Sequence, residues 1–406
     1  MRDDIGVDWA DREHAVWVDE DAGEKVMSRP VAQTVGGLAD FGRWLDERRV
    51  AGRELWAAIE KPEGRIVDFL LEHGGVVDPV NPKAVTRVRD RFRGSGAKSD
   101  RFDARVRASC LRTDHGHLTP LRPSSEAAQE LKGLTRDYTR QVRQQTRRLN
   151  QLTATLKGYY PRALEVVDDL KSQWGRAFLR DFPTPAAAAV LTERRWQRWA
   201  REHRLGAERA SARWGRLPQP QLAIPAHVVR VHTRRLAAVL EHLTVTLGAV
   251  EGYRVAIADF FGRMPGAQWA TSLPGGQSGT TVPRLYAELG DAGGRWPSVQ
   301  PLPGHAGVVP VTDRSGQHVA VYFRLACNTH LRDAAHQFAL NSLTASEWAR
   351  AYYDRCRRRG HHHHHALRAL AAKWLTIIFV LWSRRISYDE TYHLATMARQ
   401  HLRQTA

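Results

Sequence analysis

The stretch Ile5-Gly6-Val7-Asp8-Trp9, with His14-Ala15-Val16-Trp17-Val18 after it, decides the fold class of the first hundred residues. Both segments are apolar and strand-like, and the polar residues between them predict a tight turn, so a β-hairpin is expected. The pattern then predicts a helix over 38–49, a strand over 55–59, a helix over 66–71 and a short strand at 76–77. A hairpin followed by a β-α-β unit is typical of an α/β domain with a mixed sheet.

Four carboxylates in this region are candidates for chemistry. Asp8 lies within an apolar strand, where an unpaired carboxylate is costly to bury, and Glu60 ends the second apolar strand. Asp100 and Asp103 are three residues apart and share one face if the segment is helical. Converging carboxylates are hard oxygen ligands that suit Mg²⁺ or Mn²⁺. The alternative is that Asp8 ends its strand, Asp100 and Asp103 cap a helix, and Glu60 is solvated.

The chain is strongly basic, which predicts a polyanionic partner. Its 406 residues include 61 Lys and Arg against 43 Asp and Glu, a net charge of +18, and nucleic acid is the commonest partner of such a protein. The densest stretch is 83–112, with ten Lys and Arg against three Asp, and Gly94-Ser95-Gly96 inside it indicates a flexible loop. The side chains predicted to contact nucleic acid here are Arg87, Arg89, Arg91, Arg93, Lys98, Arg101 and Arg105.

Composition excludes several classes of protein. With 42% hydrophobic residues the chain can bury ordinary cores and is not intrinsically disordered. Its three cysteines are widely spaced, which is typical of a reducing compartment and not of a disulfide framework. The first residues contain no signal-peptide core, and the longest apolar run, 374–382, is much shorter than the about 20 residues of a membrane span. We therefore expect a cytosolic protein with no membrane partner.

Two long segments have the periodicity of helices that pack along their length. The first, which contains a heptad-like seam, is followed by a second helical pattern over 226–263. Coiled-coil oligomerisation is the favoured interpretation, and an internal helical hairpin is the alternative. The residues of the seam are Leu131, Leu134, Tyr138, Val142, Leu149, Leu152 and Leu156.

The last third of the chain differs in pattern. A stretch rich in Gly and Pro over 265–307 precedes a predicted β-hairpin over 308–323 and helices over 331–403. We therefore expect three domains: an α/β domain at 1–116, a helical, coiled-coil linker and oligomerisation region at 117–264, and a mainly helical domain with a small β-hairpin at 265–406.

Short motifs in a fixed order resemble those of a known family. In the first domain they are Ile5-Gly6-Val7-Asp8, Ile59-Glu60-Lys61-Pro62-Glu63-Gly64, Val80-Asn81-Pro82 and Lys98-Ser99-Asp100-Arg101-Phe102-Asp103-Ala104. In the last they are Leu273-Pro274-Gly275, Ala287-Glu288-Leu289-Gly290-Asp291, Ala306-Gly307 with Pro310, Ser315-Gly316, Asn328 with Leu331 and Arg332, and Tyr388-Asp389. The series is similar to that of the DEDD insertion-sequence transposases of the bridge-RNA-guided serine recombinase family, which are related to the Piv-type DNA invertases. The resemblance covers nearly the whole chain.

This resemblance implies a fold and a reaction. The first domain would have a ribonuclease-H or RuvC-like fold in which Asp8, Glu60, Asp100 and Asp103 bind Mg²⁺ or Mn²⁺. Ser315 matches the nucleophile of the family, which attacks a DNA phosphodiester and forms a covalent phosphoserine link. Because the link conserves the bond energy, strand exchange needs no ATP. The implied function is that of a transposase or recombinase that mobilises an insertion sequence.

The resemblance also implies partners. They are double-stranded donor and target DNA, a structured noncoding bridge RNA that supplies sequence specificity, and further copies of the chain in a dimer of dimers, in the bacterial cytosol or nucleoid. Gly275 and Gly276 match a turn whose backbone N–H groups approach a DNA phosphate, and Arg332 is assigned to nucleic-acid contacts. The commoner family form of that turn, Pro-Gly-Ile-Gly, is Pro274-Gly275-Gly276-Gln277 here, and Cys327 stands where many members have Gly.

Other interpretations of these residues stay open. Asp313-Arg314-Ser315-Gly316 also fits an ordinary hairpin turn, and Ser278 is a rival serine in a Gly-rich segment. The four carboxylates alone would suffice for a metal-dependent, structure-selective nuclease of the Holliday-junction type that uses water as the nucleophile. A non-catalytic, nucleic-acid-binding relic of a transposase would need only the basic surfaces.

Overall fold

The computed structural model describes residues 1–92, 99–118, 120–217, 219, 223–276, 279–316 and 318–405. These form two compact units with separate cores, an N-terminal unit of Met1–Pro123 and a C-terminal unit of Ser124–Ala406. Three residues singled out by their sequence, Arg93, Lys98 and Ser278, lie outside the described residues.

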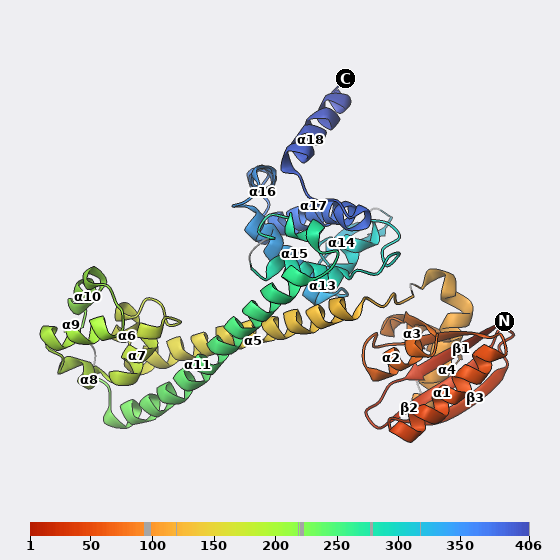
Figure 1. The fold of residues 1–406 in the computed structure, drawn as a ribbon, viewed down its shortest axis with the longest axis horizontal. Helices are drawn as coiled ribbons and strands as arrows, with labels where there is room; N and C mark the ends of the chain where they lie inside the picture. Colours follow the sequence, from red (N-terminus) through yellow and green to blue (C-terminus); the bar gives the residue numbers. More distant parts are fainter. Residues whose placement is uncertain are drawn as a thin grey trace. The chain divides into compact units, whose positions relative to one another are not determined.

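The N-terminal unit is built on a mixed five-stranded sheet (Figure 1). Strand β1 is antiparallel to β2 and parallel to β4, and the order across the sheet is β3-β2-β1-β4-β5. The predicted hairpin, β-α-β unit and mixed sheet are confirmed, and the arrangement is consistent with the ribonuclease-H-like fold; β3 was not expected. The strands are β1 (Arg2–Asp8), β2 (Glu13–Glu20), β3 (Lys25–Ala32), β4 (Glu54–Ile59) and β5 (Val76–Pro79).

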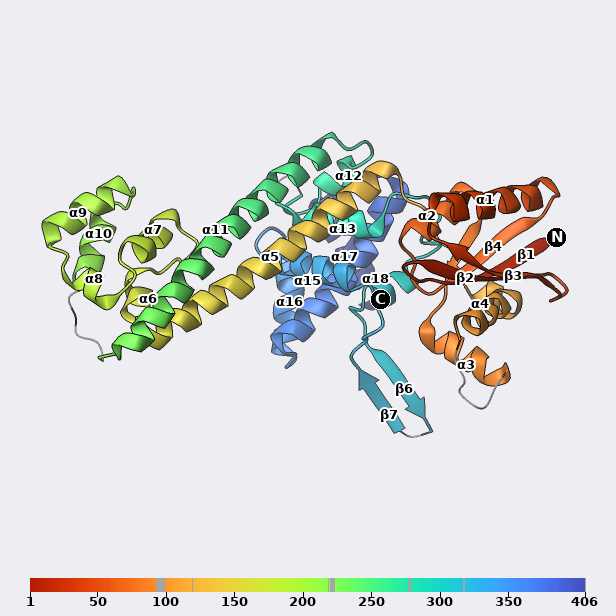
Figure 2. The same ribbon diagram turned by 90° about the horizontal axis from the view of Figure 1, so that it is seen from below.

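Helices cover both faces of this sheet (Figure 2). Helices α1 (Val35–Val50) and α2 (Arg65–Glu72) pack on one face, and α3 (Pro82–Phe92) and α4 (Asp100–Asp114) pack on the other, with a short 3₁₀ turn at His115–His117. Successive side chains of a strand point to opposite faces. Ile5 and Val7 therefore join the core under α1 and α2, whereas Gly6 and Asp8 lie on the α4 face.

Gly6 allows α4 to lie directly on β1, and we expect Gly6→Ala to force them apart. An added Cβ would lie 1.8 Å from the carbonyl oxygen of Ala104 and 2.6 Å from the backbone nitrogen of Ala108. Overpacking of this kind costs about 1–3 kcal/mol, so the N-terminal unit should unfold at a lower urea concentration. Gly36→Ala, at an open position of α1, is the matched control and should unfold like the wild type. Equal unfolding of the two variants would contradict this packing argument.

Asp78 on β5 is a buried carboxylate with few polar partners to offset the cost of its burial. Its side chain is fully buried, and within the part of the chain that the structure describes neither of its oxygens has a hydrogen-bond partner. Burial raises the pKa of Asp78 from 3.8 to about 6. For a raised carboxyl pKa, the stabilising contribution is complete below the unfolded value and is lost as the pH rises through the folded value. The N-terminal unit therefore loses stability as the pH rises from about 4 to above 6.

We expect Asp78→Asn to stabilise the N-terminal unit at pH 7.5. One unit of pKa shift corresponds to about 1.4 kcal/mol of stability. The asparagine amide is also polar and would be buried, so part of the desolvation cost remains after the substitution. The gain in unfolding free energy should therefore be about 2 kcal/mol. Urea unfolding, followed by hydrogen exchange of peptides from β4 and β5, measures it. The gain should nearly vanish at pH 4, and the exposed Asp68→Asn should show none at either pH. An equal gain at both pH values would contradict the assignment to Asp78.

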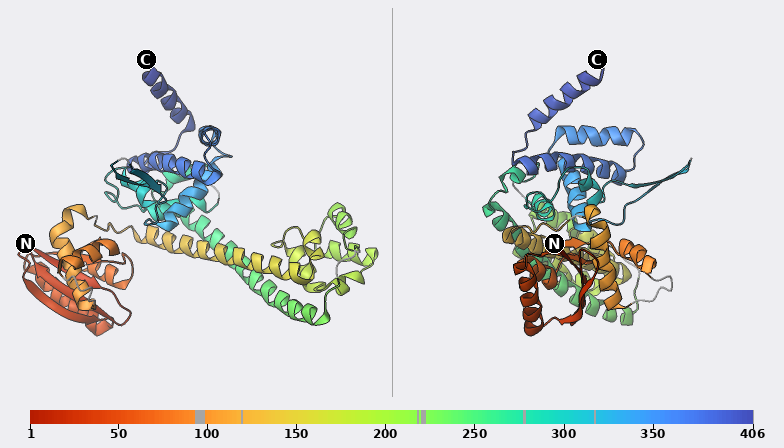
Figure 3. Two further views of the ribbon diagram at one scale, coloured as in Figure 1. Left: turned by 180° about the vertical axis from the view of Figure 1, so that it is seen from behind. Right: turned by 90° about the vertical axis from the view of Figure 1, so that its right-hand side faces the viewer.

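Two long antiparallel helices form the spine of the C-terminal unit (Figures 1 and 3). Helix α5 (Glu126–Tyr159) leads out and α11 (Ala226–Arg263) returns beside it, so that Leu152 and Leu156 of the predicted seam share a core with Leu240. The internal hairpin, the alternative interpretation, is thus the arrangement within one chain. Oligomerisation through these helices stays a prediction.

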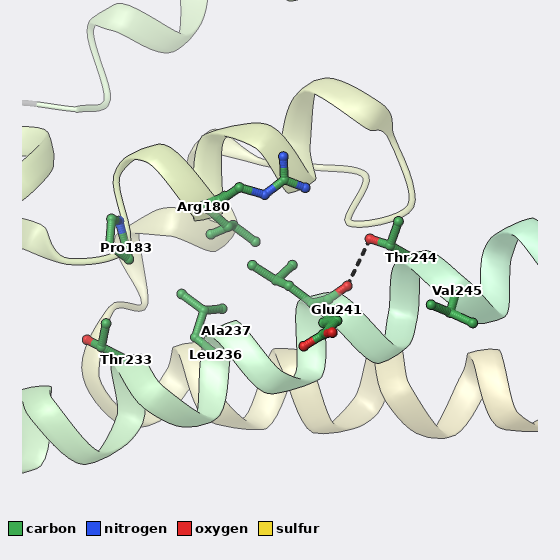
Figure 4. A pocket seen from close by; sticks show the side chains of 10 residues that line it. Arg180, Pro183, Thr233, Leu236, Ala237, Glu241, Thr244 and Val245 are labelled. Atoms are coloured by element: carbon green, nitrogen blue, oxygen red, sulfur yellow. Dashed lines mark hydrogen bonds between the residues drawn. The ribbon is translucent and has the colours of Figure 1, made fainter.

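Five short helices join the outer ends of this pair and bury Trp196 and Trp199, whose rings are stacked 5.5 Å apart. An open groove of about 450 Å³ lies between α7 and α11, with mainly apolar walls that include Leu236 and Leu240 (Figure 4). It contains none of the predicted site residues. The short helices are α6 (Arg162–Val166), α7 (Gln173–Asp181), α8 (Pro185–Ala189), α9 (Glu193–Glu202) and α10 (Ala207–Trp214).

The last part of the chain is a helical body from which a β-hairpin projects (Figure 2). The predicted hairpin is confirmed as β6 (Val311–Ser315) and β7 (His318–Tyr322), and the predicted helices after it are confirmed as well. The helices of this body are α12 (Gln268–Thr271), α13 (Thr281–Leu289), α14 (Pro301–His305), α15 (Thr329–Ser342), α16 (Glu347–Arg358), α17 (His363–Arg384) and α18 (Glu390–Thr405).

One helix among the described residues, α17, is long and apolar enough to cross a membrane. Its residues Leu370, Trp374, Leu375 and Ile378 are instead buried in the core of the C-terminal unit. The Trp374 indole N–H donates to the hydroxyl of Ser342 on α15 (2.9 Å). Helix α17 therefore packs as the core helix of this unit.

Candidate active site

Asp8 and Glu60 lie side by side at the ends of two neighbouring parallel strands. Val7 of β1 pairs with Ile59 of β4, so the next residue of each strand carries one of the two carboxylates. The Asp8 side chain is 19% exposed and that of Glu60 is 49% exposed. Both carboxylates can thus be reached from solvent at one edge of the sheet.

The guanidinium of Arg107 bridges these two carboxylates. Its Nη1 is 2.9 Å from Oδ1 of Asp8, and its Nη2 is 3.1 Å from Oε2 of Glu60. Arg107 is only 3% exposed and comes from α4, the helix that packs on β1 at Gly6. A buried arginine is stable only if it is paired, and here its partners are two of the predicted metal ligands.

Asp100 and Asp103 occupy the first turn of α4, as the spacing predicts. The residue that caps this helix is Ser99, whose hydroxyl accepts a hydrogen bond from the Phe102 N–H (3.3 Å), so the alternative role of the two aspartates as caps is wrong. Asp100 is exposed. Asp103 is buried, and one of its oxygens lies 2.7 Å from Nη2 of Arg89 on α3.

The strand and helix carboxylates influence one another. Burial raises the pKa of Asp8, the Arg107 guanidinium opposes this rise, and the negative charges of Asp103 and Asp100 add to it. Electrostatic interactions between charged groups weaken with distance. The charges of Asp100 and Asp103 thus act on Asp8, which Arg107 joins to Glu60.

The donor chemistry of this site fits a divalent cation. All four candidate ligands are carboxylates, the hard oxygen donors that Mg²⁺ and Mn²⁺ prefer. The pKa of Asp8 is raised mainly by burial and further by the charges of Asp103 and Asp100, and a bound cation would favour its ionised form. Among the described residues the acidic side chains do not form a ready-made metal cage. Within the described part of the chain, Arg107 and Arg89 neutralise part of their charge.

Most of the predicted nucleic-acid contacts in this unit are available to a ligand. Arg87, Arg91, Arg101 and Arg105 are exposed on α3 and α4, beside the carboxylates. Arg101 donates to the hydroxyl of Ser28, and Arg105 lies over the Trp17 and Phe92 rings. Arg89 differs, because it is engaged by Asp103. The exposed arginines make the surface around the carboxylates attractive to a phosphate backbone.

Ser315 is the last residue of β6, and its partner across the hairpin is His318. Its side chain is exposed, and the turn begins at Gly316, whose φ of +57° favours glycine. The segment therefore belongs to a hairpin, but Asp313, Arg314 and Ser315 lie in its strand and only Gly316 of the four lies in the turn. An exposed hydroxyl at the end of a projecting strand is also accessible to a large substrate.

The residues of the C-terminal unit predicted to contact nucleic acid differ in their exposure. They are Gly275, Gly276 and Arg332. Gly275 is exposed with φ +73°, while Gly276 is buried and its N–H donates to the Leu273 carbonyl (2.7 Å), which leaves that donor engaged within the protein. Arg332 is half-buried, with its guanidinium over the Phe323 ring and one N–H directed at the sulfur of Cys327 (3.4 Å).

One buried network was not expected from the sequence. Glu288 of α13 is 2% exposed and accepts two hydrogen bonds from Arg136 of α5 (2.8 and 3.1 Å) and one from the Asn328 amide (2.9 Å). Burial would raise the pKa of Glu288, but these donors outweigh it and hold the pKa below its usual value. Asn328 also caps α15 immediately after the β6–β7 hairpin. The network therefore anchors the segment that carries Ser315; the signal for it was an acidic residue within the otherwise apolar stretch 285–289.

Comparison with known proteins finds transposase models that match both the N-terminal and the C-terminal part of the chain. A model of the DEDD transposase domain of the IS110 type, described as "Transposase", matches residues 5–161, and the "Transposase IS116/IS110/IS902 family" model matches residues 267–354. A mini-circle putative transposase for IS117 from Streptomyces coelicolor is 31% identical over 95% of each chain. An uncharacterized 42 kDa protein of insertion element IS900 from Mycobacterium paratuberculosis is 28% identical over 96% of this chain and 97% of its own. A putative transposase, y4uE, from Sinorhizobium fredii is 36% identical over 49% of this chain and 56% of its own.

Proposed function

This chain belongs to the IS116/IS110/IS902 family of transposases, and we propose that it cuts and rejoins DNA through a phosphoserine link formed by Ser315. Its function as the transposase of an insertion sequence follows from the family; the nucleophile, the metal and the guide are the parts proposed. The observation that supports the proposal is that Arg107 bridges Asp8 and Glu60 at the ends of two parallel strands, and that Asp100 and Asp103 lie on the same helix as Arg107.

The proposed reaction is a reversible exchange of phosphodiester bonds. The Ser315 oxygen attacks the phosphorus of a DNA strand, the Ser315 O–P bond forms, and the bond from phosphorus to one sugar oxygen breaks. The departing sugar oxygen takes up a proton, and the serine hydroxyl loses one. When the hydroxyl of another strand attacks the phosphoserine, a DNA phosphodiester is restored and Ser315 is released. The number of phosphoester bonds stays constant, so no energy source is required.

The four carboxylates are proposed to hold Mg²⁺ or Mn²⁺, which as a Lewis acid would polarise the attacked phosphate. Asp8 and Glu60 would bind from the strand ends, and Asp100 and Asp103 would bind from α4. The exposed arginines of α3 and α4 would hold the flanking DNA backbone by their charge. Together they would orient the phosphate toward an incoming hydroxyl.

We further propose the partners and organisation that accompany this reaction. Donor and target DNA would be selected by base pairing with a structured bridge RNA, while the protein contacts mostly backbone. Exchange of two duplexes needs four cleavages, which a dimer of dimers could supply in the bacterial cytosol or nucleoid. The domains would be the metal-binding domain at 1–116, the helical and oligomerisation region at 117–264 and the serine-bearing domain at 265–406.

The test is a reconstituted cleavage assay. The purified chain is incubated with Mg²⁺ and DNA that carries the ends of the element, with and without the noncoding RNA transcribed beside the gene. The expected result is an RNA-dependent, denaturant-resistant protein–DNA adduct, mapped by mass spectrometry to Ser315. If adducts form equally well without RNA, the proposed RNA guidance is wrong. If the adduct maps to another residue, Ser315 is not the nucleophile.

A second candidate function is a metal-dependent nuclease that uses water. It is favoured by one observation: the four carboxylates belong to the N-terminal unit alone, whereas Ser315 belongs to the C-terminal unit. In that case the same assay would yield cut DNA with no covalent adduct. A non-catalytic relic would bind DNA in a salt-dependent manner and leave it intact.

A further inference from the structure

Ser315 and His318 lie opposite each other at the end of the β6–β7 hairpin (Figure 2). They are the last paired residues before the turn that begins at Gly316. Side chains of directly opposite residues lie on the same face of a two-stranded sheet, with Cβ atoms about 4.5–5.5 Å apart. At that separation, rotation about χ1 can bring an imidazole nitrogen within hydrogen-bond reach of a serine hydroxyl. Both side chains are exposed, so a large substrate can reach the pair.

The proposed nucleophile needs a base, and the hairpin provides one in this position. A serine hydroxyl attacks slowly unless a neighbouring group takes up its proton. Asp313 and Tyr322 also lie on this face, because alternate residues of a strand share a face. With a rise of about 3.4 Å per residue, Asp313 is roughly 7 Å and Tyr322 roughly 14 Å along the strands from this pair. Among the described residues of the hairpin, His318 is therefore the group placed to accept the Ser315 proton.

The charged neighbours of His318 within the hairpin are exposed. Asp313 contributes one negative charge on the same face, and Arg314 contributes one positive charge on the opposite face. Interactions between such exposed charges contribute little, because water and salt screen them. The assignment therefore depends on the position of His318 directly opposite the hydroxyl.

We propose that His318 is the general base that activates Ser315. The inference rests on the proposed function, because it assumes that Ser315 is the nucleophile. As the Ser315 oxygen bonds to phosphorus, its proton passes to the neutral imidazole, and the departing sugar oxygen takes up a proton from water. In the rejoining step the attacking sugar hydroxyl gives its proton to water. The imidazolium then returns its proton to the Ser315 oxygen as the bond to phosphorus breaks, so no further reactant is required.

The experiment measures the single-turnover rate of adduct formation by the full chain, under the conditions of the cleavage assay. The pH is varied from about 5 to 8, the range in which a histidine ordinarily changes its charge. We expect the wild-type rate to rise with pH and then level off. His318→Gln should be slower by about a hundredfold or more at neutral pH and should lose this levelling, as expected when a general base is removed.

Tyr322→Phe is the matched control, because it removes another exposed titratable group from the same strand and the same face. Its rate should stay within about threefold of the wild type. A His318→Gln rate within that same margin, with an unchanged pH profile, would overturn the inference and leave the proposed function intact. A wild-type chain that forms no adduct would overturn both.

A second measurement separates general-base catalysis from a structural role. Free imidazole should raise the rate of His318→Ala by at least about tenfold, because a base supplied from solution can take up the Ser315 proton. It should not restore an adduct to Ser315→Ala, which lacks the hydroxyl. If imidazole leaves the His318→Ala rate unchanged and its pH profile matches that of the wild type, His318 only shapes the hairpin and the inference is wrong.

Discussion

Ser315→Ala is expected to abolish the covalent protein–DNA adduct and to lower strand transfer by at least about a thousandfold, because removal of a nucleophile eliminates the step that conserves the phosphoester bond. The side chain is exposed at the end of β6, so the substitution should leave the fold of the C-terminal unit unchanged. The measurement is gel analysis of denatured reactions for DNA-linked protein and for rejoined products.

The matched control is Thr312→Ala, which removes another exposed hydroxyl from the same strand. It should retain adduct formation to within about threefold, as expected for a surface substitution away from the chemistry. Ser315→Ala protein that still cuts DNA without an adduct would support the water-dependent nuclease. An adduct that persists in Ser315→Ala would place the nucleophile elsewhere, with Ser278 the first serine to test.

The sheet could be predicted from the sequence except at its edge. Apolar core residues recur at every second position in β1, β2 and β4, which is the period of a strand. They are Ile5 and Val7, Val16 and Val18, and Leu55, Ala57 and Ile59. β3 (Lys25–Ala32) lacks this pattern: it contains Pro30, only Val31 is fully buried, and its other residues are exposed or half-buried. Edge strands need little apolar surface, since only one side pairs and the neighbouring strand supplies the register. β3 forms because it pairs with β2. The apolar pattern of residues 25–32 alone does not predict it.

The long helices show what apolar periodicity in the sequence can and cannot predict. Their apolar spacing correctly predicts α5 and α11, but such spacing indicates which face is buried and not what covers it. In the structure α11 covers α5 within one chain. Only the tertiary arrangement decides between a partner helix in the same chain and one in a second copy.

The carboxylates of the candidate site could be predicted from the sequence, but the role of Arg107 could not. Asp8, Glu60, Asp100 and Asp103 stand out because carboxylates in apolar or regularly spaced positions are unusual. Arg107 is one of ten basic residues between 83 and 112 and looks like part of a nucleic-acid surface. Its spacing of four from Asp103 was the available signal. That it turns inward depends on Gly6, which brings α4 onto the sheet.

Asp8→Asn should lower DNA cleavage by at least about a thousandfold while the protein stays folded, because an amide replaces a charged ligand at the centre of the proposed metal site. Asp4→Asn is the matched control: Asp4 lies on the same strand and the same face, is more deeply buried than Asp8, and is paired with Arg2 instead of Arg107. It should cleave DNA at a rate within about threefold of the wild type.

This pair of variants separates catalysis from stability. Burial raises the carboxyl pKa of both Asp4 and Asp8, so the melting temperatures of the two variants should change in the same direction. Only Asp8→Asn removes a carboxylate that is coupled to Asp100 and Asp103. Loss of cleavage in Asp8→Asn alone therefore assigns the chemistry to the corner where β1, β4 and α4 meet. Equal loss in both variants would mean that the defect is one of folding, and cleavage that survives in Asp8→Asn would exclude these carboxylates from the reaction.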